Sequence, residues 1–285
     1  MNFTPIPGTE ASLAESPVWD ERQGALLWTD IPAGTIHELT LATGARRKWV
    51  LAGPVGSFGL CEDGRLIVAR REEVGVLDRD SGDYTPLARL LPEGAAQRLN
   101  DGKPGPDGAF WVGAMDDTPQ KRPIAALYRV DGAGRVEVKR AGLITSNGLA
   151  FAPDGRALYH SDSRGCWIER YDLDPHNGAL TGQTRIATPQ EADGRPDGAT
   201  IDAEGCYWSA GVSAGCLNRY APTGTLIARY PVPVPAPTMP CFGGPGLRTL
   251  FITSLSHAAG GTGQVLSAPA PVAGIAAWRF AGRAK

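Results

Sequence analysis

Four side chains that end in oxygen recur at a similar distance before a glycine-containing turn. Asn147 and Asp197 each lie seven residues before the acidic residue of such a turn, and the Asn100-Asp101 pair lies six residues before one. Glu15 lies nine residues before Gly24. A lone Asn-Gly or Asp-Gly dipeptide is ordinary turn chemistry, because glycine adopts positive φ and asparagine or aspartate bonds its own backbone. Unrelated turns would not be preceded by such side chains at nearly the same distance, a distance called the phase from here on. The shared phase therefore predicts that these side chains lie close together in the fold.

The chemistry of this set is that of a hard divalent cation. Oxygen-only ligands favour Ca²⁺, Mg²⁺ or Mn²⁺ ahead of Zn²⁺. Three protein ligands, with water in the remaining positions, would leave room for a substrate. None of the four histidines shares the phase and no Gly-x-Ser-x-Gly sequence occurs, which disfavours a Ser-His-Asp hydrolase. No P-loop occurs, and no Gly-x-Gly-x-x-Gly leads from a strand into a helix, which disfavours a nucleotide cofactor.

The turns that set this phase belong to a repeat that runs through the chain. The sequence holds 37 glycines and 24 prolines, and no collagen-like period accounts for them. A short β-rich run follows each turn, and successive turn glycines are separated by 40, 44, 47, 50 and 41 residues. These glycines are Gly24, Gly64, Gly108, Gly155, Gly205 and Gly246. Four short strands in ~40–50 residues is the period of a propeller blade.

The repeat predicts one all-β domain over residues 1–285, a six-bladed β-propeller with four antiparallel strands per blade. The best helix candidate, residues 88–98, is broken by Pro92 and Gly94. A pair of β-sandwiches is the alternative, but the repeat continues through mid-chain without a break in composition. In a propeller the innermost strands line a central channel, and ligands bind at its mouth. Either residues 1–7 or residues 274–280 could supply the outermost strand of the last blade.

Charge and composition exclude several partners. The chain has 28 basic and 30 acidic residues, and no basic block stands out, so nucleic acid and anionic membrane are poor candidates. No run approaches 18 apolar residues, so no membrane-spanning helix is expected. The N-terminus lacks the positive and apolar regions of a secretory signal, and the five cysteines are odd in number with no C-x-x-C spacing. These features predict a reduced, cytoplasmic compartment.

The sequence resembles the SMP-30/gluconolactonase family, which includes regucalcin and the bacterial sugar lactonases. The matching stretches occur in order along nearly the whole chain. They are Glu15–Trp19, Arg98–Gly102, Ser146–Phe151, Arg195–Gly198 and Cys241–Gly244. The first stretch usually reads Glu-Gly-Pro in the family, and here Ser16 replaces the glycine.

The resemblance implies a six-bladed propeller that holds one divalent metal ion through Glu15, Asn147 and Asp197. It also implies that Arg98 and Asn100 bind substrate oxygens and that Asp197 doubles as the acid/base. The identity of the metal stays open among calcium, zinc, magnesium, manganese and iron.

One position departs from the pattern that the resemblance implies. Some family members add an acidic substrate ligand three residues after the methionine that ends the second strand of the third unit. Counted from Met115, that position is Thr118, and Asp116 and Asp117 are only near it. Whether either aspartate contacts the substrate, and with it the substrate preference, stays open.

The expected substrate is a small polyhydroxylated lactone. A metal ion could stabilise the oxyanion that develops on the lactone carbonyl, and Asp197 could take a proton from water. The resemblance therefore implies an aldonolactonase acting on an arabinono-, xylono-, glucono- or galactonolactone. Asp202, near the distal turn of the same strand, is expected to lie away from the channel mouth and to tolerate substitution by asparagine.

Two other functions remain open at this point. One is a broader metal-dependent esterase or phosphotriesterase, which would suit a more apolar channel mouth than Arg98, Asn100 and Asp101 provide. The other is a non-catalytic propeller that binds calcium or a protein partner, because the architecture alone does not set the function.

Overall fold

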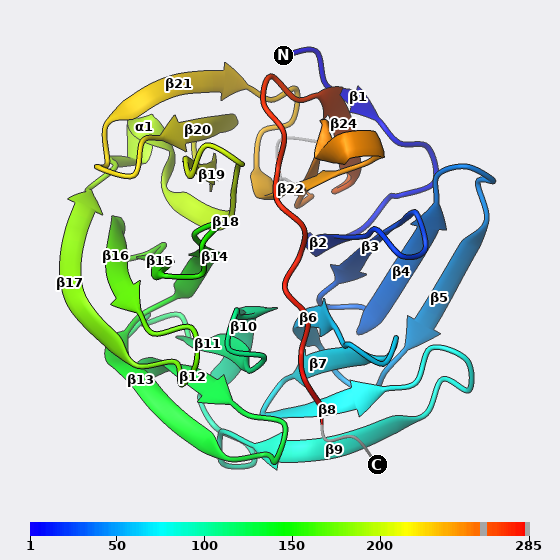
Figure 1. The fold of residues 1–285 in the computed structure, drawn as a ribbon, viewed down its shortest axis with the longest axis vertical. Coiled ribbons are helices and arrows are strands. Elements are labelled where there is room, and N and C mark those ends of the chain that lie inside the picture. Colours follow the sequence, from blue (N-terminus) through cyan, green and yellow to red (C-terminus); the bar gives the residue numbers. More distant parts are fainter. Residues whose placement is uncertain (257–260, 283–285) are drawn as a thin grey trace.

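The computed structural model describes residues 1–256 and 261–282. Within these residues, six four-stranded antiparallel sheets radiate around a central axis, so the predicted six-bladed propeller is confirmed (Figure 1). The sandwich alternative is wrong, because each sheet pairs only its own four strands. Besides the strands there are two short helical segments, α1 (Glu191–Gly194) and the 3-10 turn η1 (Pro245–Leu247).

The innermost strands surround the central channel, and each begins a blade. Neighbouring innermost strands lie against one another around the ring. For blades 1 to 6 they are β2 (Ala14–Asp20), β6 (Val55–Leu60), β10 (Gln97–Pro104), β14 (Ser146–Phe151), β18 (Pro196–Ile201) and β22 (Pro237–Gly243). The next strands outward are β3 (Ala25–Asp30), β7 (Leu66–Arg70), β11 (Phe110–Asp116), β15 (Ala157–Asp162), β19 (Tyr207–Gly211) and β23 (Thr249–Ser254).

The two outer positions of each blade complete the sheets. The third strands are β4 (Thr35–Thr40), β8 (Glu73–Leu77), β12 (Ala125–Val130), β16 (Trp167–Leu173), β20 (Cys216–Tyr220) and β24 (Val265–Pro269). The outermost are β5 (Arg46–Val50), β9 (Tyr84–Arg89), β13 (Val136–Leu143), β17 (Leu180–Ala187), β21 (Leu226–Pro231) and β1 (Thr4–Pro5). Exposure rises outward, since β3 and β15 are buried along their whole length and most of β5 is exposed.

Large aromatic side chains fill the space between blades. Trp28, Trp111 and Trp208 on the second strands are fully buried, and Trp208 of blade 5 meets Phe242 of blade 6 edge to face, with ring centroids 5.6 Å apart. Burial of side chains this large is a major source of stability, at roughly 25 cal/mol for each Å² of apolar surface removed from water. The packed blades hold the innermost strands in a fixed ring.

The N-terminus closes the ring. Strand β1 pairs with β24, with Thr4 opposite Ser267, so of the two alternatives residues 1–7 supply the outermost strand. Residues 274–280, called the strap from here on, do not form a strand of the sixth blade. They cross one end of the channel, as the red segment in Figure 1 shows, and are pinned by bridges from Gly274 to Asp202 and from Phe280 to Cys61.

Candidate functional site at the channel mouth

The end of the channel away from the strap holds a pocket. Its lining includes all five residues that the sequence singles out, namely Glu15, Arg98, Asn100, Asn147 and Asp197. They come from four different blades. The expected convergence of these side chains is confirmed, and their roles are taken up as proposals below.

Irregularities in the strand register explain why these positions share a phase. The innermost strand of every blade has a register shift against its neighbour, and in the four blades that supply the candidate ligands two of its residues lie opposite one, which is a β-bulge. The bulges lie at Glu15–Val18, Leu99–Gly102, Asn147–Ala150 and Pro196–Ala199. A bulge bends the strand and redirects a side chain that would otherwise follow the alternation of the sheet. Each candidate oxygen ligand therefore lies at or beside a bulge, where the bend of the backbone changes the direction of its side chain.

Asn147 lies at the centre of a hydrogen-bonded row. Its Nδ2 donates to Asp197 Oδ1 at 2.6 Å and to Ser163 Oγ at 2.8 Å. Its Oδ1 accepts from Asn100 Nδ2 at 3.2 Å, and Asn100 Oδ1 accepts from Arg98 Nη1 at 2.8 Å. The row fixes five side chains relative to one another, so the site is preorganised rather than assembled by a ligand.

Glu15 is held from its own backbone. Its Oε2 accepts a 2.7 Å hydrogen bond from the main-chain nitrogen of Ser16. Ser16 has a φ of 48°, a left-handed conformation that glycine adopts more easily than serine. This explains in physical terms why a glycine suits the position, and shows that serine accepts the strain here.

Burial and like charges raise the pKa values of the two carboxyl groups. Burial, with a smaller contribution from Asp101, raises the pKa of Asp197 to about 8. Burial also raises the pKa of Glu15, and the charges of Asp197 and Asp101 raise it further. A bound cation would reduce the electrostatic repulsion among the carboxylates of Glu15, Asp197 and Asp101.

The donor set fits a divalent cation. Glu15 Oε1 and Asp197 Oδ2 accept no hydrogen bond from any residue that the structure describes. Among the residues that the structure describes, both carboxylates line the pocket with the amide of Asn147, and no histidine or cysteine does. Oxygen-only donors of this kind suit a hard metal ion with open coordination positions.

The loop that follows β11 does not place an acidic side chain in the pocket lining. Asp116 is fully buried and turned into its own loop, where it accepts hydrogen bonds from Thr118 and Arg122. Asp117 bonds Arg71 Nη1 at 2.9 Å. Among the described lining residues this loop contributes Lys121 instead. Neither aspartate lines the pocket, although Asp117 Oδ1 lies 3.5 Å from Nε of Arg98, which does.

Two charged residues close to the site, Asp101 and Lys103, were given no role from the sequence. Asp101 is buried, with Oδ1 unpartnered and Oδ2 accepting from the nitrogen of Leu149 at 2.9 Å. Lys103 extends into the channel and donates to the carbonyl of Ala199. Burial lowers the pKa of Lys103, and Asp101 opposes that shift. The doublet Asn100-Asp101 was a visible signal for one of them, but nothing in the pattern marks Lys103.

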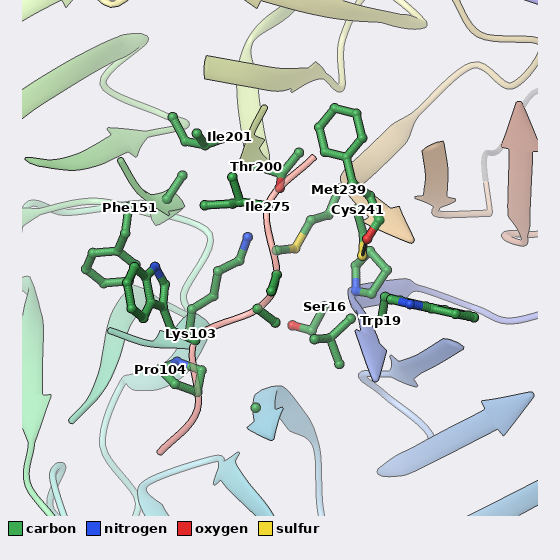
Figure 2. A pocket seen from close by; sticks show the side chains of 18 of the residues that line it. Ser16, Trp19, Lys103, Pro104, Phe151, Thr200, Ile201, Met239, Cys241 and Ile275 are labelled. Carbon is green, nitrogen blue, oxygen red and sulfur yellow. Dashed lines mark hydrogen bonds between the residues drawn. The ribbon is translucent and has the colours of Figure 1, made fainter. Parts of the chain in front are cut away.

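Lys103 also lines a second, apolar pocket under the strap (Figure 2). There it lies among side chains such as Phe151, Met239 and Ile275. The ammonium of Lys103 thus lies between the apolar end of the channel and the carboxyl groups of the mouth.

Asp202 does not behave as the sequence suggests. It lies outside the mouth pocket as expected, but it is fully buried. Its carboxylate accepts hydrogen bonds from Trp208 Nε1 at 2.7 Å, Arg219 Nε at 2.8 Å and the main-chain nitrogens of Glu204 and Cys206 at 2.9 Å. These bonds lead to the opposite expectation for asparagine, which should destabilise the blade because an amide offers only one acceptor oxygen. The same bonds explain why Asp202, Glu204 and Cys206 cluster without any need for a metal ion.

Comparison with known proteins now decides the family. The pattern of the SMP-30/Gluconolactonase/LRE-like region matches residues 13–256. The chain belongs to this family. A 6-deoxy-6-sulfogluconolactonase of Pseudomonas putida is 40% identical over 85% of this chain and 83% of its own length. A pentonolactonase of Haloferax volcanii is 32% identical over 93% of this chain and 87% of its own length.

Solved structures of the family have the same architecture. A calcium-binding regucalcin from Agrobacterium tumefaciens superposes with a TM-score of 0.90 at 28% identity, covering 95% of each chain. In residues 1–256 and 261–282 of this family member, no helix has the length and apolar character needed to cross a bilayer.

Proposed function

We propose that this protein is a metal-dependent lactonase that opens an aldonolactone, of the arabinono-, xylono-, glucono- or galactono- type, to the sugar acid. The chain is a lactone-hydrolysing hydrolase, as its lactonase-named relatives at 32–40% identity indicate. The observation that carries the finer proposal is the convergence of Glu15, Asn147 and Asp197 with Arg98 and Asn100 in one recessed pocket.

Glu15, Asn147 and Asp197 would hold the metal ion. When bound, a divalent cation supplies Lewis acidity to the lactone carbonyl. The pKa of about 8 for Asp197 reflects burial and protein charges alone, and a neighbouring cation favours the ionised carboxylate. The carboxylate is then free to act as a base near neutral pH.

Asp197 performs the proton transfers in this scheme. It takes a proton from the attacking water as the water oxygen bonds to the carbonyl carbon. The bond between that carbon and the ring oxygen then breaks, and the ring oxygen receives the proton from Asp197. The product is a hydroxy acid, which releases one proton to solution at neutral pH.

Arg98 and Asn100 bind the hydroxyl groups of the substrate. Arg98 Nη2 donates to no residue that the structure describes, and the Nη1 bond to Asn100 fixes the guanidinium plane. Burial lowers the pKa of Arg98, and the carboxylates of Asp117 and Glu15 oppose that shift. A fixed donor fork beside a carboxamide suits a polyhydroxylated ring better than an apolar ester.

A lactone panel tests the proposal. Purified protein is supplied in turn with calcium, magnesium, manganese, zinc or ferrous iron, and acid release from each aldonolactone is followed with a pH indicator above the spontaneous rate. We expect at least one metal and lactone pair to be turned over. Faster hydrolysis of phenyl acetate or of a phosphotriester than of every lactone would favour the esterase alternative, and metal binding without any turnover would favour a binding protein.

A further inference from the structure

The mouth pocket is cationic on one side and aliphatic on the other. Three of its four aliphatic side chains come from blades 1 and 6, namely Leu13, Ile31 and Leu255. Its cations come from blades 3, 4 and 5, and are Arg98 on β10, Lys121 between β11 and β12, Arg164 between β15 and β16, and Arg195 just before β18. A substrate in this pocket therefore meets different chemistry at its two ends.

Two of the four cations are already paired. Arg195 Nη1 lies 2.7 Å from Glu191 Oε1, and Arg98 Nε lies 3.5 Å from Asp117 Oδ1. For Lys121 and Arg164, no carboxylate of residues 1–256 and 261–282 lies within ion-pair distance. The only side-chain bond of Lys121 to this part of the chain goes to the main-chain oxygen of Asp116, at 2.8 Å.

Among the described lining residues, cations outnumber carboxylates at the mouth. Glu15 and Asp197 are the acidic ones, and they would offset the charge of one divalent cation. Lys121, which is half-buried, and Arg164, which is exposed, then add two positive charges that no carboxylate of the described residues pairs with. A neutral sugar ring offers them hydrogen-bond acceptors but no countercharge.

Lys121 is positioned by its loop rather than left free. Its φ of 51° is in the left-handed region, which is uncommon for a residue with a side chain. The loop is tied down by the buried Asp116 carboxylate, whose Oδ2 accepts from the main-chain nitrogen of Arg122 at 2.7 Å. Such strain persists only where the surroundings impose it, and it concentrates at ligand-binding positions.

We propose that the substrate is a lactone that carries a tetrahedral anionic group, a sulfonate or a phosphate monoester, and that Arg164 and Lys121 bind this group. The inference rests on the proposed function and adds the class of substrate. The planar guanidinium of arginine matches two oxygens of such a group, and the lysine ammonium adds a point charge.

The first test compares substrates on the metal-loaded wild-type protein. The value of kcat/KM is measured for 6-phosphogluconolactone, a 6-sulfonated gluconolactone and glucono-1,5-lactone, each at low and at high ionic strength. We expect at least one anionic lactone to exceed the neutral one by about tenfold, with an advantage that shrinks in salt because the paired charges are screened. The ratio between the two anionic lactones shows which group the site takes. An equal or better value for the neutral lactone overturns the proposal.

The second test removes one charge at a time. Arg164→Met and Lys121→Met should each reduce the ratio of kcat/KM for the preferred anionic lactone to that for the neutral lactone by about tenfold, mainly through KM. Arg156→Met is the matched control, since Arg156 is exposed in the β14–β15 turn at the other end of the same blade. A ratio unchanged in both mouth variants, or changed equally in the control, overturns the proposal.

A binding measurement separates this inference from the proposed function. Calorimetric titration of gluconate and of 6-phosphogluconate needs no turnover. If the wild type hydrolyses no lactone, the proposed function fails, yet selective binding of 6-phosphogluconate that is lost in Arg164→Met would still support the anion site. Equal binding of the two acids would overturn it.

Discussion

The two ends of the channel are built from the same six strands but in opposite ways. At the mouth, bulges interrupt the strands, polar side chains bond one another, and carboxyl groups crowd together. At the other end, the strap lies over an apolar pocket and its Phe280 is fully buried. The two ends therefore contribute differently to the stability of the fold. The like charges at the mouth destabilise it, and the apolar surface buried at the strapped end stabilises it.

Metal removal should have the largest effect, and it should act on the mouth alone. Chelator-treated protein is expected to lose its lactonase activity and part of its thermal stability, because the carboxyl groups repel one another and a cation that binds the folded state stabilises it. Both should return when a divalent ion is added. Activity assays and thermal melts with metal analysis check this, and full activity in protein shown to be metal-free would contradict the metal site.

Asp197→Asn should come next. The amide keeps the shape and one oxygen, but it cannot take a proton from water, so kcat should fall by roughly 10²–10⁴-fold while the protein stays folded. Steady-state kinetics with metal content measured in parallel check the expectation. Asp154→Asn, in the exposed β14–β15 turn, is the control in place of Asp202. Equal activity of the two variants would remove Asp197 from the reaction.

Phe280→Ala probes the strapped end. Its ring packs in a buried cluster that includes Cys61 and Phe110, so truncation should cost about 3–5 kcal/mol of unfolding free energy. At temperatures where the variant stays folded, KM and kcat should change little. Phe280→Leu should recover much of the stability. A drop in kcat as large as that of Asp197→Asn in folded protein would show that the two ends are not independent.

A buried histidine behind the mouth should make the fold sensitive to acid. His160 is fully buried against Ser146 Oγ at 2.8 Å, and burial lowers its pKa to about 3. The unfolded chain takes up a proton below pH ~6.5 and the folded chain does not, so stability is lost as the pH falls from there toward 3. Between pH 7 and pH 5 this loss is about 2 kcal/mol.

Denaturant unfolding at the two pH values measures this effect. His160→Gln should lose less stability between pH 7 and pH 5 than the wild type, because the glutamine does not titrate. An identical loss in both proteins would assign the acid sensitivity to other groups.

The smallest effect on stability and activity is expected from Ser16→Gly. Ser16 lies between the mouth and the strapped end of the channel. Its backbone nitrogen bonds Glu15, while its buried Oγ has no partner and the residue lines the strapped pocket. Ser16→Gly relieves left-handed strain of about 1 kcal/mol and removes an unsatisfied hydroxyl, against the entropy cost of glycine. A rise of a few degrees or less in Tm, with unchanged kcat, is the expected outcome of a thermal melt. A clear fall in Tm would mean that the hydroxyl is bonded in solution.

The periodic part of the molecule could be predicted from the sequence, and the non-periodic part could not. Turn glycines such as Gly155 and Gly205 recur because every blade needs the same hairpin, and the phase of Asn147 and Asp197 follows from it. Lys121 and Lys103 belong to no repeat. Their positions follow from one loop fold and from the depth of the channel, which only the packed structure reveals.

The role of Asp202 could not be predicted from the local sequence, because it depends on tertiary packing. The turn that contains Asp202 looks like any other distal turn, yet its carboxylate organises four donors from three directions of the chain. The sequence around it contains no sign of this, because Trp208 and Arg219 reach it from neighbouring strands of the blade. Solvent-exposed and buried turn aspartates share the same local pattern.

The pairing of β1 with β24 has a consequence for how the chain folds as it is made. Five blades each take four consecutive strands, so they can form as those strands emerge from the ribosome. The sixth must bring Thr4 and Pro5, which precede the other described strands, to Ser267 and Leu266, more than 250 residues later in the sequence. Contacts between such distant segments form slowly, since a long loop must close first. The growing chain therefore carries an open ring with an unpaired strand edge until β24 has been made.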